Sequence, residues 1–587
     1  MRNLQNKLLS FIIVVVIVLG VAACKKSFLE QDTVGLLTEA ELQSKKGAEQ
    51  LLTGVYSAIK GIGWEGGGSN WVYGSISGME ANKGSDAGDQ ADINPIQRYE
   101  HLPGNNYFNV KWRALYGGIA MANAAIRVTS ALTEADISAA DKDQLLAEAR
   151  FLRGFYHFEA KKMWNKIPYV DETVQYGTSF AEVSNAEDAW PKIMEDLQFA
   201  RTTLTPTKAQ IGRINKWAAD AFYAKALLFQ QKYAEALPIL TGVINNGVTT
   251  GGIKYALAPS YPDLFNADVE NAATTRAESV FAYEASINDG SGGQNANWEQ
   301  ILNFPHNTGA NGPGGCCGFF QPAFEFVNSF RTSVVGLPLL DHSYNTGANQ
   351  VVTDMGIQSN EAFTPDAGNL DPRLDWTVGR RGIPFLDWGL HPGRSWIRDQ
   401  ANGGPYTPKK MSYYKSQTGK LTDGTSWTSG LTATNYKLMR FADVLLMAAE
   451  AEAEAGSLVK ATEYVNMVRA RAAKPETWVK NGAANAANYV IGLYPTFTSQ
   501  ANARMAIRME RKLELGMEGH RFFDLVRWGI AAEDINRILT YERPKLSAAY
   551  GNATFTAPRN LYFPIPQRQI DLQQENGSST LTQNEGY

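Results

Sequence analysis

Apolar residues recur at helical spacing in several separate stretches of the chain. In residues 143–164 they return every three or four positions, as on a helix with one buried face. The same spacing returns in residues 214–233, after which a very short turn leads into another stripe. Two further stripes, 444–455 and 461–472, lie on either side of Gly456. These patterns predict pairs of helices joined by tight turns.

The small residues in these stripes would let paired helices approach closely, and the helix, turn, helix layout resembles tetratricopeptide repeats. The spacing between pairs is irregular, so we expect repeats embedded in a larger fold rather than a free solenoid. Residues 61–110 and 285–430 differ, being rich in Gly, Asn, Asp, Pro and aromatic residues. Loops of this length are usually functional. The sequence predicts a mainly α-helical fold whose helix pairs pack against a loop-rich ligand-binding region with little β-structure.

The N-terminus has the layout of a bacterial secretion signal. Arg2 and Lys7 precede an apolar run at 8–21, which is shorter than the roughly 20 residues of a membrane-spanning helix. Small residues then lead into Cys24, and this junction resembles a lipobox, in which the cysteine is lipidated and becomes the mature N-terminus. We expect residues 1–23 to be a lipoprotein signal peptide and Cys24 to carry the lipid, including palmitate. A plain secretion signal with a chance cysteine is the alternative.

Charge and motifs argue against several other classes of function. The formal net charge is −4 at pH 7 and no basic stripe is present, so we expect no nucleic-acid partner. The six histidines are scattered, and "GIGWEG" at 61–66 leads into more glycine rather than a helix, so we expect no metal and no cofactor. Asp86, Asp89 and Asp92 do not have the spacing of an EF-hand, which favours a solvated acidic loop.

Several longer segments resemble the SusD/RagB family of outer-membrane nutrient-binding lipoproteins. The C-terminal run "RMERKLELGMEGHRFFDLVRWG" is the most specific of them, and His520 is its one departure from the family pattern. The other matching segments are "WRALYGGIAMANAAI", "EARFLRGFYHFEAKKMW", "YKLMRFADVLLMAAEAEAEAGSLVKATEYVNMVRARA", "YFPIPQRQID" and "LTQNEGY". By this resemblance the chain is identified as a member of that family.

The resemblance implies a fold, a location and a partner. The family's four tetratricopeptide-like helix pairs pack against a loop-rich region that holds the ligand. Its members are lipid-anchored at the outer membrane, bind oligosaccharides or other nutrients, and cover a SusC-like TonB-dependent transporter without acting as enzymes. We therefore expect a signal peptide at 1–23, an N-terminal helical region at 24–250, and a C-terminal region with the ligand-binding loops at 251–587, the two regions forming one compact unit.

Binding sites for sugars combine flat aromatic rings with polar hydrogen-bonding groups. Aromatic residues in the loops are therefore the candidates, whereas the helix-borne Trp112, Trp164, Trp190 and Trp217 are expected in the core. For each loop residue, burial in the core is the alternative. The predicted glycan-binding residues are Trp64, Trp71, Tyr73, Trp298, Phe319, Phe320, Trp388, Trp396 and Tyr406.

Two of the three cysteines are adjacent, in "GPGGCCGFFQP". With Cys24 lipidated, Cys316 and Cys317 have no other thiol partner, and the nearest histidines fit no standard zinc spacing. An exported protein meets an oxidising compartment, and the flanking glycines would let the backbone accommodate a tight ring. We predict a vicinal disulfide that forms a rigid apolar bump beside Phe319 and Phe320. A buried, reduced pair is the alternative.

Two other functions stay open from the sequence. A surface glycoside hydrolase also binds sugar with aromatic residues, and needs two carboxylates about 5–10 Å apart. Asp371, Asp375 and Asp387 are candidates, although Pro372 favours a turn with local pairing. The third possibility is a structural scaffold that recruits envelope proteins.

The charges of the C-terminal run favour a structural role. Asp524 and Arg527 lie three positions apart on a predicted helix and can pair. Met509, Leu513 and Met517 are expected to share one helix face.

Overall fold

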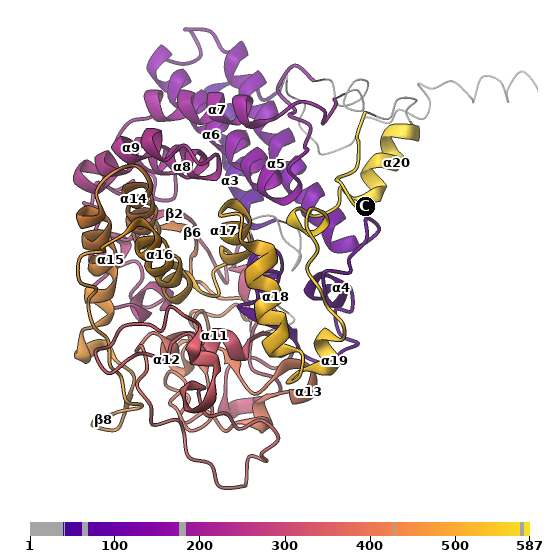
Figure 1. Cartoon of the computed structure of the whole chain (residues 1–587). Coiled ribbons are helices and arrows are strands. Elements are labelled where there is room, and N and C mark those ends of the chain that lie inside the picture. Colours follow the sequence, from indigo (N-terminus) through magenta and orange to yellow (C-terminus); the bar gives the residue numbers. More distant parts are fainter. Residues whose placement is uncertain are drawn as a thin grey trace, which may run out of the picture.

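The computed structural model of the chain describes residues 39, 41–61, 69–174, 183–426, 428, 430–575 and 580–587. Long helices form a layer across the top and left of the molecule, and residues of the 285–430 region form loops and short elements below it (Figure 1). The prediction of a mainly α-helical fold is therefore confirmed. The signal peptide at 1–23, Cys24 and Trp64 lie outside the described residues.

The helical layer is built from long helices, each of which packs against the next helix of the layer. Although far apart in sequence, α9 and α14 are neighbours, so the layer continues from the N-terminal to the C-terminal region. Its members are α3 (Lys45–Ser57), α5 (Asn106–Ala131), α6 (Ala139–Trp164), α7 (Trp190–Thr203), α8 (Lys216–Phe229), α9 (Tyr233–Asn246), α14 (Phe441–Ala455), α15 (Leu458–Ala472) and α16 (Gln500–Leu515).

The predicted stripes become buried helix faces. Ser138 begins α6, its hydroxyl accepting the Asp141 N–H at 3.1 Å. Close packing of α5 on α6 requires Gly118, because a Cβ there would lie 2.6 Å from the ring of Tyr156. The apolar positions of the α6 stripe are all buried: Leu145, Ala149, Leu152, Tyr156, Ala160 and Met163.

The other helix pairs also begin and end as the pattern predicts. A three-residue turn joins α8 to α9, and Gly456 follows the last residue of α14.

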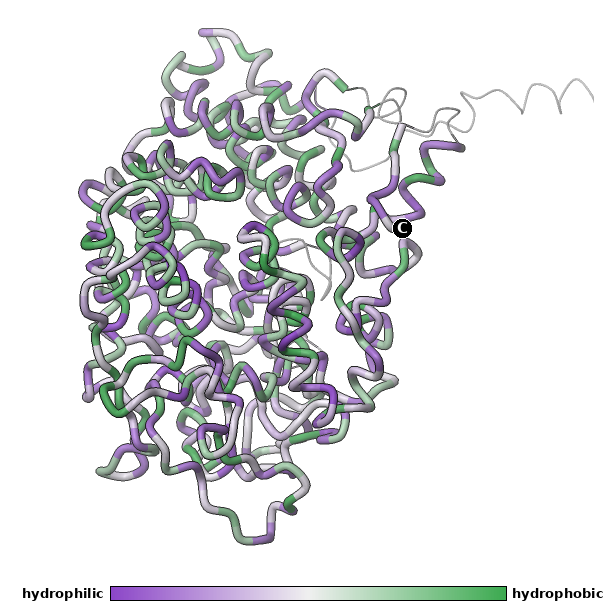
Figure 2. The backbone as a smooth tube through the Cα atoms, in the orientation of Figure 1, coloured by the Kyte–Doolittle hydropathy of each residue, from purple (hydrophilic) through white to green (hydrophobic). Residues whose placement is uncertain are grey.

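Trp112 and Trp164 are buried as expected, whereas Trp190 and Trp217 are only half-buried. In Figure 2 the helices alternate between hydrophobic and hydrophilic positions. Within the described residues, no helix combines the length and apolarity needed to span a membrane.

Shorter helices and strands organise the rest of the described chain. The β-structure consists of two-stranded antiparallel pairs: β1 (Ala81–Gly84) with β3 (Phe319–Pro322), β2 (Ser279–Tyr283) with β6 (Tyr436–Arg440), β4 (Val378–Gly379) with β5 (Thr407–Pro408), and β7 (Lys480–Asn481) with β8 (Ala484–Asn485). The shorter helices are α4 (Ile93–Gln97), α10 (Ala273–Arg276), α11 (Phe324–Asn328), α12 (Leu374–Thr377), α13 (Gln400–Gly403), α17 (Arg521–Arg527), α18 (Ala531–Glu542), α19 (Ser547–Tyr550) and α20 (Gln567–Glu575).

One hydrophobic core includes side chains from both predicted regions. Phe151 of α6, Phe222 of α8 and Phe281 of β2 meet edge to face, with ring centroids 5.5–5.8 Å apart. The β2–β6 pair thus brings the second half of the chain against the N-terminal helices. The boundary at residue 250 stays a prediction, while the two regions share their core.

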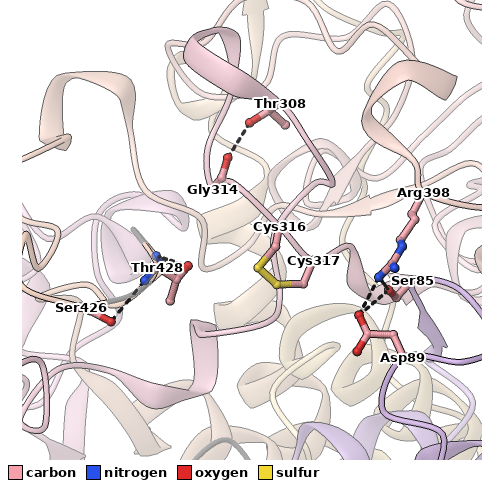
Figure 3. Close-up of a disulfide and its surroundings, with 10 residues drawn as sticks. Ser85, Asp89, Thr308, Gly314, Cys316, Cys317, Arg398, Ser426 and Thr428 are labelled. Carbon is pink, nitrogen blue, oxygen red and sulfur yellow. Dashed lines mark hydrogen bonds and ion pairs between the residues drawn. A yellow bond between two sulfur atoms is a disulfide. The ribbon is translucent and has the colours of Figure 1, made fainter.

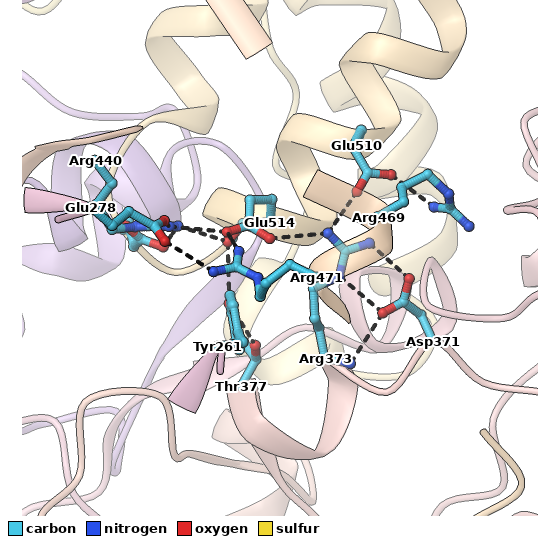
Figure 4. A network of polar contacts seen from close by, with 12 residues as sticks. Tyr261, Glu278, Asp371, Arg373, Thr377, Arg440, Arg469, Arg471, Glu510 and Glu514 are labelled. Carbon is cyan, nitrogen blue, oxygen red and sulfur yellow. Dashed lines mark hydrogen bonds and ion pairs between the residues drawn. The ribbon is translucent and has the colours of Figure 1, made fainter. Parts of the chain in front are cut away.

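A buried network of charges lies where α16 faces the loop-rich region (Figure 4). Glu514 of α16 accepts from Arg440 at 3.0 Å, from Arg373 at 3.1 Å and from Arg471 at 2.5 Å. One turn earlier on the same helix, Glu510 accepts from Arg373 at 2.6 Å. These side chains are at most 2% exposed, so each charge depends on its partners rather than on water.

The last helices extend these ion pairs. Arg527 donates to Asp524 at 2.8 Å within α17, which confirms the predicted pair. Met509 and Leu513 are buried on α16 as expected. Because α16 ends at Leu515, Met517 lies beyond the helix, although its side chain is still buried.

We predict that Glu514→Gln lowers the free energy of unfolding by about 3–5 kcal/mol, since it leaves three buried guanidinium groups short of a carboxylate. Chemical denaturation measures the loss. Glu463→Gln is the control, because its exposed pair with Lys460 on α15 contributes at most about 1 kcal/mol. Equal stability of the two variants would contradict a structural role for the network.

The same variant has a distinct pH dependence. Burial alone would raise the pKa of Glu514, but Arg471, Arg440 and Arg373 outweigh burial and hold that pKa well below its usual range. A depressed pKa contributes stability above the unfolded value of about 4.3, and this contribution is lost as pH falls toward the folded value. Wild-type stability should therefore fall more steeply below about pH 4 than that of Glu514→Gln.

Candidate functional site

Six of the predicted glycan-binding residues lie in the core. The ring of Trp71 packs against Phe319 and Phe320, with centroids 6.4 and 5.6 Å away. The six residues, each at most 5% exposed, are Trp71, Tyr73, Phe319, Phe320, Trp396 and Tyr406. A ring without an open face cannot stack on a sugar, so these residues support the site from beneath rather than contact a ligand.

Trp298 and Trp388 are the predicted residues that stay half-buried. The indole N–H of Trp298 donates to the carbonyl of Gly293 at 3.1 Å, and that of Trp388 donates to the carbonyl of Tyr413 at 3.0 Å. Trp388 also meets the Tyr413 ring edge-on at 5.9 Å. Each indole is thus held at its polar edge while part of its surface faces solvent, as a stacking platform requires.

The cysteine loop is held by hydrogen bonds to Tyr413, which Trp388 also contacts, and to two other residues. The Gly314 N–H donates to the hydroxyl of Tyr413 at 2.8 Å, and the Gly318 N–H donates to the carbonyl of Phe304 at 3.1 Å. Thr308 donates to the Gly314 carbonyl at 2.9 Å. Gly314 has a φ of 76°, and a Cβ there would lie 2.8 Å from the Phe304 side chain. The loop is therefore wrapped closely around Phe304.

Packing contacts continue from the cysteine loop to Trp298. Phe304 packs edge-on against Tyr413 at 5.6 Å, and its ring also lies against Gly430. The next residue, Leu431, lies against Gly293, whose carbonyl binds the Trp298 indole. Trp388 and Trp298 are thus connected through one run of buried packing contacts.

Cys316 and Cys317 are joined by a disulfide in this structure (Figure 3). Cys316 is half-buried, whereas Cys317 is 7% exposed. In Figure 3 the bridge lies between Ser426 and Thr428 on one side and Arg398 on the other.

The Arg398 side of the bridge is polar and charged. Arg398 binds Asp86 and Asp89, each at 2.6 Å, and donates to the hydroxyl of Ser85 at 2.9 Å. The sequence had favoured a solvated acidic loop. In the structure Asp86 and Asp89 are instead ion-paired with Arg398. Burial and then Arg398 lower the pKa of the neighbouring His306, so its imidazole is neutral at pH 7 and can both donate and accept.

We give the name disulfide platform to a group of residues that these contacts connect: Trp298, His306, Cys316, Cys317, Trp388 and Arg398. It combines two anchored indoles, an apolar bridge and hydrogen-bonding side chains. Flat rings with a polar rim fit a pyranose, whose C–H faces are apolar and whose hydroxyls point outward. Among the described residues, no group of three or more His, Cys, Asp or Glu side chains could hold a metal ion.

A separate cleft of about 380 Å³, lined by none of the platform residues, opens beside α3 and β2. Its walls include Tyr56 of α3, Arg213, Tyr283 of β2 and Asn295. The sequence did not indicate these residues, because Tyr56 lies in a helix and Tyr283 in a strand, where an aromatic side chain is usually predicted to be buried. Only the packing of α3 near β2 exposes their sides to a common space.

The carboxylates proposed for a hydrolase already have partners. Asp371 binds Arg373 at 2.8 Å, and Asp375 binds Arg380 at 2.6 Å; both carboxylates are fully buried. Asp387 is exposed but accepts the backbone N–H of Ser416 at 3.0 Å. The two buried carboxylates have neither the solvent access nor the free oxygens that an acid–base pair needs.

For the bridge itself, we predict that a peptide spanning 312–322 from untreated protein is lighter by two hydrogens than the dithiol form and does not react with an alkylating agent. Mass spectrometry before and after reduction measures both properties. Two freely alkylated thiols in untreated protein would contradict the disulfide. Cys316→Ser with Cys317→Ser is the matched variant for later binding assays.

Comparisons of sequence place the chain among known proteins. A profile described as the SusD family matches residues 277–587, and a second, described as "Starch-binding associating with outer membrane", matches residues 29–228. SusD-like protein P25 of Formosa agariphila is 24% identical over 611 aligned residues, which cover 99% of this chain and 100% of that protein.

Solved structures show the same fold at low identity. A SusD superfamily protein from Bacteroides vulgatus has a TM-score of 0.66 and 20% identity, covering 93% of this chain and 100% of that chain. Surface glycan-binding protein A from Bacteroides thetaiotaomicron, solved in complex with laminarihexaose, has a TM-score of 0.63 and 19% identity, covering 92% and 99%. Since the SusD-family profile alone spans more than half of the 587 residues, this chain belongs to the SusD family.

Proposed function

We propose that the protein is a lipid-anchored glycan-binding protein of the outer membrane that faces the outside and delivers its ligand to a SusC-like TonB-dependent transporter without cleaving it. Family membership supports this role. So do the names of relatives with the same fold, one a laminarin binding SusD-like protein and another solved with laminarihexaose. The profile over residues 29–228 carries a description that includes association with the outer membrane.

The observation that carries the binding proposal is the disulfide platform. Trp298 and Trp388 are half-buried, and a hydrogen bond fixes the polar edge of each indole. Little side-chain entropy is then lost when a ring stacks on either of them. The half-buried Cys316 would add an apolar contact, and Arg398 and His306 would supply hydrogen bonds. This arrangement supports binding of a neutral glycan chain across several sugar rings.

Catalysis is disfavoured by the positions of the candidate acids. The ion pairs of Asp371 and Asp375 hold both carboxylates in the core, away from the disulfide platform. A purely structural scaffold remains a competing function, and it predicts no affinity for glycans. Direct binding measurements separate these functions.

We predict that Trp298→Ala and Trp388→Ala each weaken glycan binding by about 1–3 kcal/mol, because each removes an anchored stacking ring. Calorimetric titration of a panel of neutral oligosaccharides that includes laminarihexaose measures the loss. Trp478→Ala is the control, since Trp478 is also half-buried and its indole donates to the Ala472 carbonyl at 2.9 Å, outside the platform. Normal affinity in both folded platform variants would refute this location, and cleavage of any oligosaccharide would refute a purely binding role.

We further predict that Cys24→Ser releases the protein from outer-membrane fractions and abolishes fatty-acid labelling. The physical reason is that the acyl chains carried by Cys24 would supply the proposed membrane attachment, and serine cannot carry them. Purification of the wild type from native membranes should recover a large TonB-dependent barrel protein. A wild type that is unlabelled, or that is always recovered alone, would contradict the anchor or the transporter complex respectively.

A further inference from the structure

A second pocket, with no residue in common with the disulfide platform, opens between α16, α18 and the segment 340–344. Its volume is about 270 Å³, slightly below the range of about 300–1,000 Å³ typical of small-molecule sites. That size suits one sugar ring rather than a chain. Part of its wall is apolar and adaptable, formed by Leu340, Met505, Met509 and Ile530.

The remaining wall carries more cations than the nearby acids can neutralise. Glu325 of α11 accepts from both Lys512, at 2.5 Å, and Arg537, at 2.9 Å. Asp534 accepts from Arg521 and again from Arg537, each at 2.7 Å. The carboxylates of Glu325 and Asp534 therefore neutralise only two of these three positive charges. The buried Nε of Arg521 also has no acceptor among the described residues.

Arg508 adds a fourth cation to the same pocket. Within the described part of the chain, its guanidinium has no ion pair and no hydrogen bond, and it lies over the ring of Trp528 at 5.1 Å. The carboxylates on its other side are already engaged: Glu450 accepts from Arg527 at 2.5 Å, and Glu454 accepts from Arg504 at 2.5 Å. Arg508 lines both this pocket and a small cavity that it shares with Glu450, Glu454 and Trp528; because neither carboxylate is ion-paired with it, its N–H donors can bind a ligand in the pocket.

Other titratable groups at the pocket do not remove this excess of positive charge. Glu533 is exposed at the rim on the first turn of α18 and opposes an anion only through solvent. Burial and then Arg537 lower the pKa of His342, which keeps its imidazole neutral. A neutral imidazole can donate to a sugar hydroxyl or carboxylate without changing the charge balance.

We propose that this pocket is a second ligand site, which binds one anionic sugar residue, a hexuronate or a sulfated hexose, with its oxyanion on Arg508. A guanidinium pairs with carboxylate or sulfate oxygens through two parallel hydrogen bonds. The apolar wall of Met505, Met509 and Ile530 then receives the C–H face of the ring. That the oxyanion is carried on a sugar rests on the proposed function, whereas the charge balance does not.

Titration of the full chain with glucuronate, glucose 6-sulfate, glucose and sodium sulfate tests the site. We expect at least one anionic sugar to bind, with affinity that falls as NaCl rises, and glucose to show no binding. Arg508→Gln should weaken that binding at least about tenfold, and Arg508→Lys should retain part of it. Lys460→Gln is the control, because it also removes one positive charge, but from an exposed pair with Glu463 on α15 that does not line the pocket; its affinity should stay within about twofold of wild type.

Absence of binding by both anionic sugars, equal binding of glucose, or unchanged affinity in a folded Arg508→Gln variant would overturn the proposal. Binding of sodium sulfate as tightly as the anionic sugars would also overturn it, since the pocket would then recognise an adventitious ion only. The platform variants Trp298→Ala and Trp388→Ala should bind the anionic sugar normally. Failure of the platform and failure of this pocket are therefore separate results.

Discussion

Glu514 and the arginines around it hold the helical layer and the loop-rich region in one fixed arrangement. The network draws Arg373 from the loops, Arg440 from the end of β6 and Arg471 from α15 to a single helix, α16. Each of these charges is costly to bury alone, so the segments can dock only where all of them are paired. Such a network specifies geometry more than it adds net stability, which suits a scaffold that must present long loops reproducibly.

The loop-rich region uses a different device at its surface. Its aromatic residues divide into two layers, one packed beneath the surface and one held at it by hydrogen bonds. Trp71 and Phe319 fill the space under β1 and β3, whereas Trp298 and Trp388 expose part of their rings and attach their indole N–H groups to carbonyls. Those hydrogen bonds restrain the exposed rings, and restraint reduces the entropy lost when a ligand binds.

Charge distinguishes the two candidate ligand sites. At the disulfide platform, Arg398 is balanced by Asp86 and Asp89, so the surface offers hydrogen bonds without a strong net field. At the pocket beside α16, Arg508 has no such partner in the part of the chain that the structure describes. A glycan with both neutral and acidic units would find complementary chemistry at the two places.

The sequence by itself determined the elements whose causes are local. Helical spacing predicted α6, α8, α9, α14 and α15; adjacency in the chain predicted the Cys316–Cys317 bridge that the structure contains, and the spacing of Asp524 and Arg527 predicted their pair. Burial was decided only by the tertiary structure. Trp71 and Phe319 have the same glycine-rich surroundings as Trp298, yet β1 pairs with β3 across a long sequence separation and closes over the first two. The partners of Glu514 likewise come from distant segments, and Arg508 has no ion pair among the described residues, because long-range packing decides which charges meet.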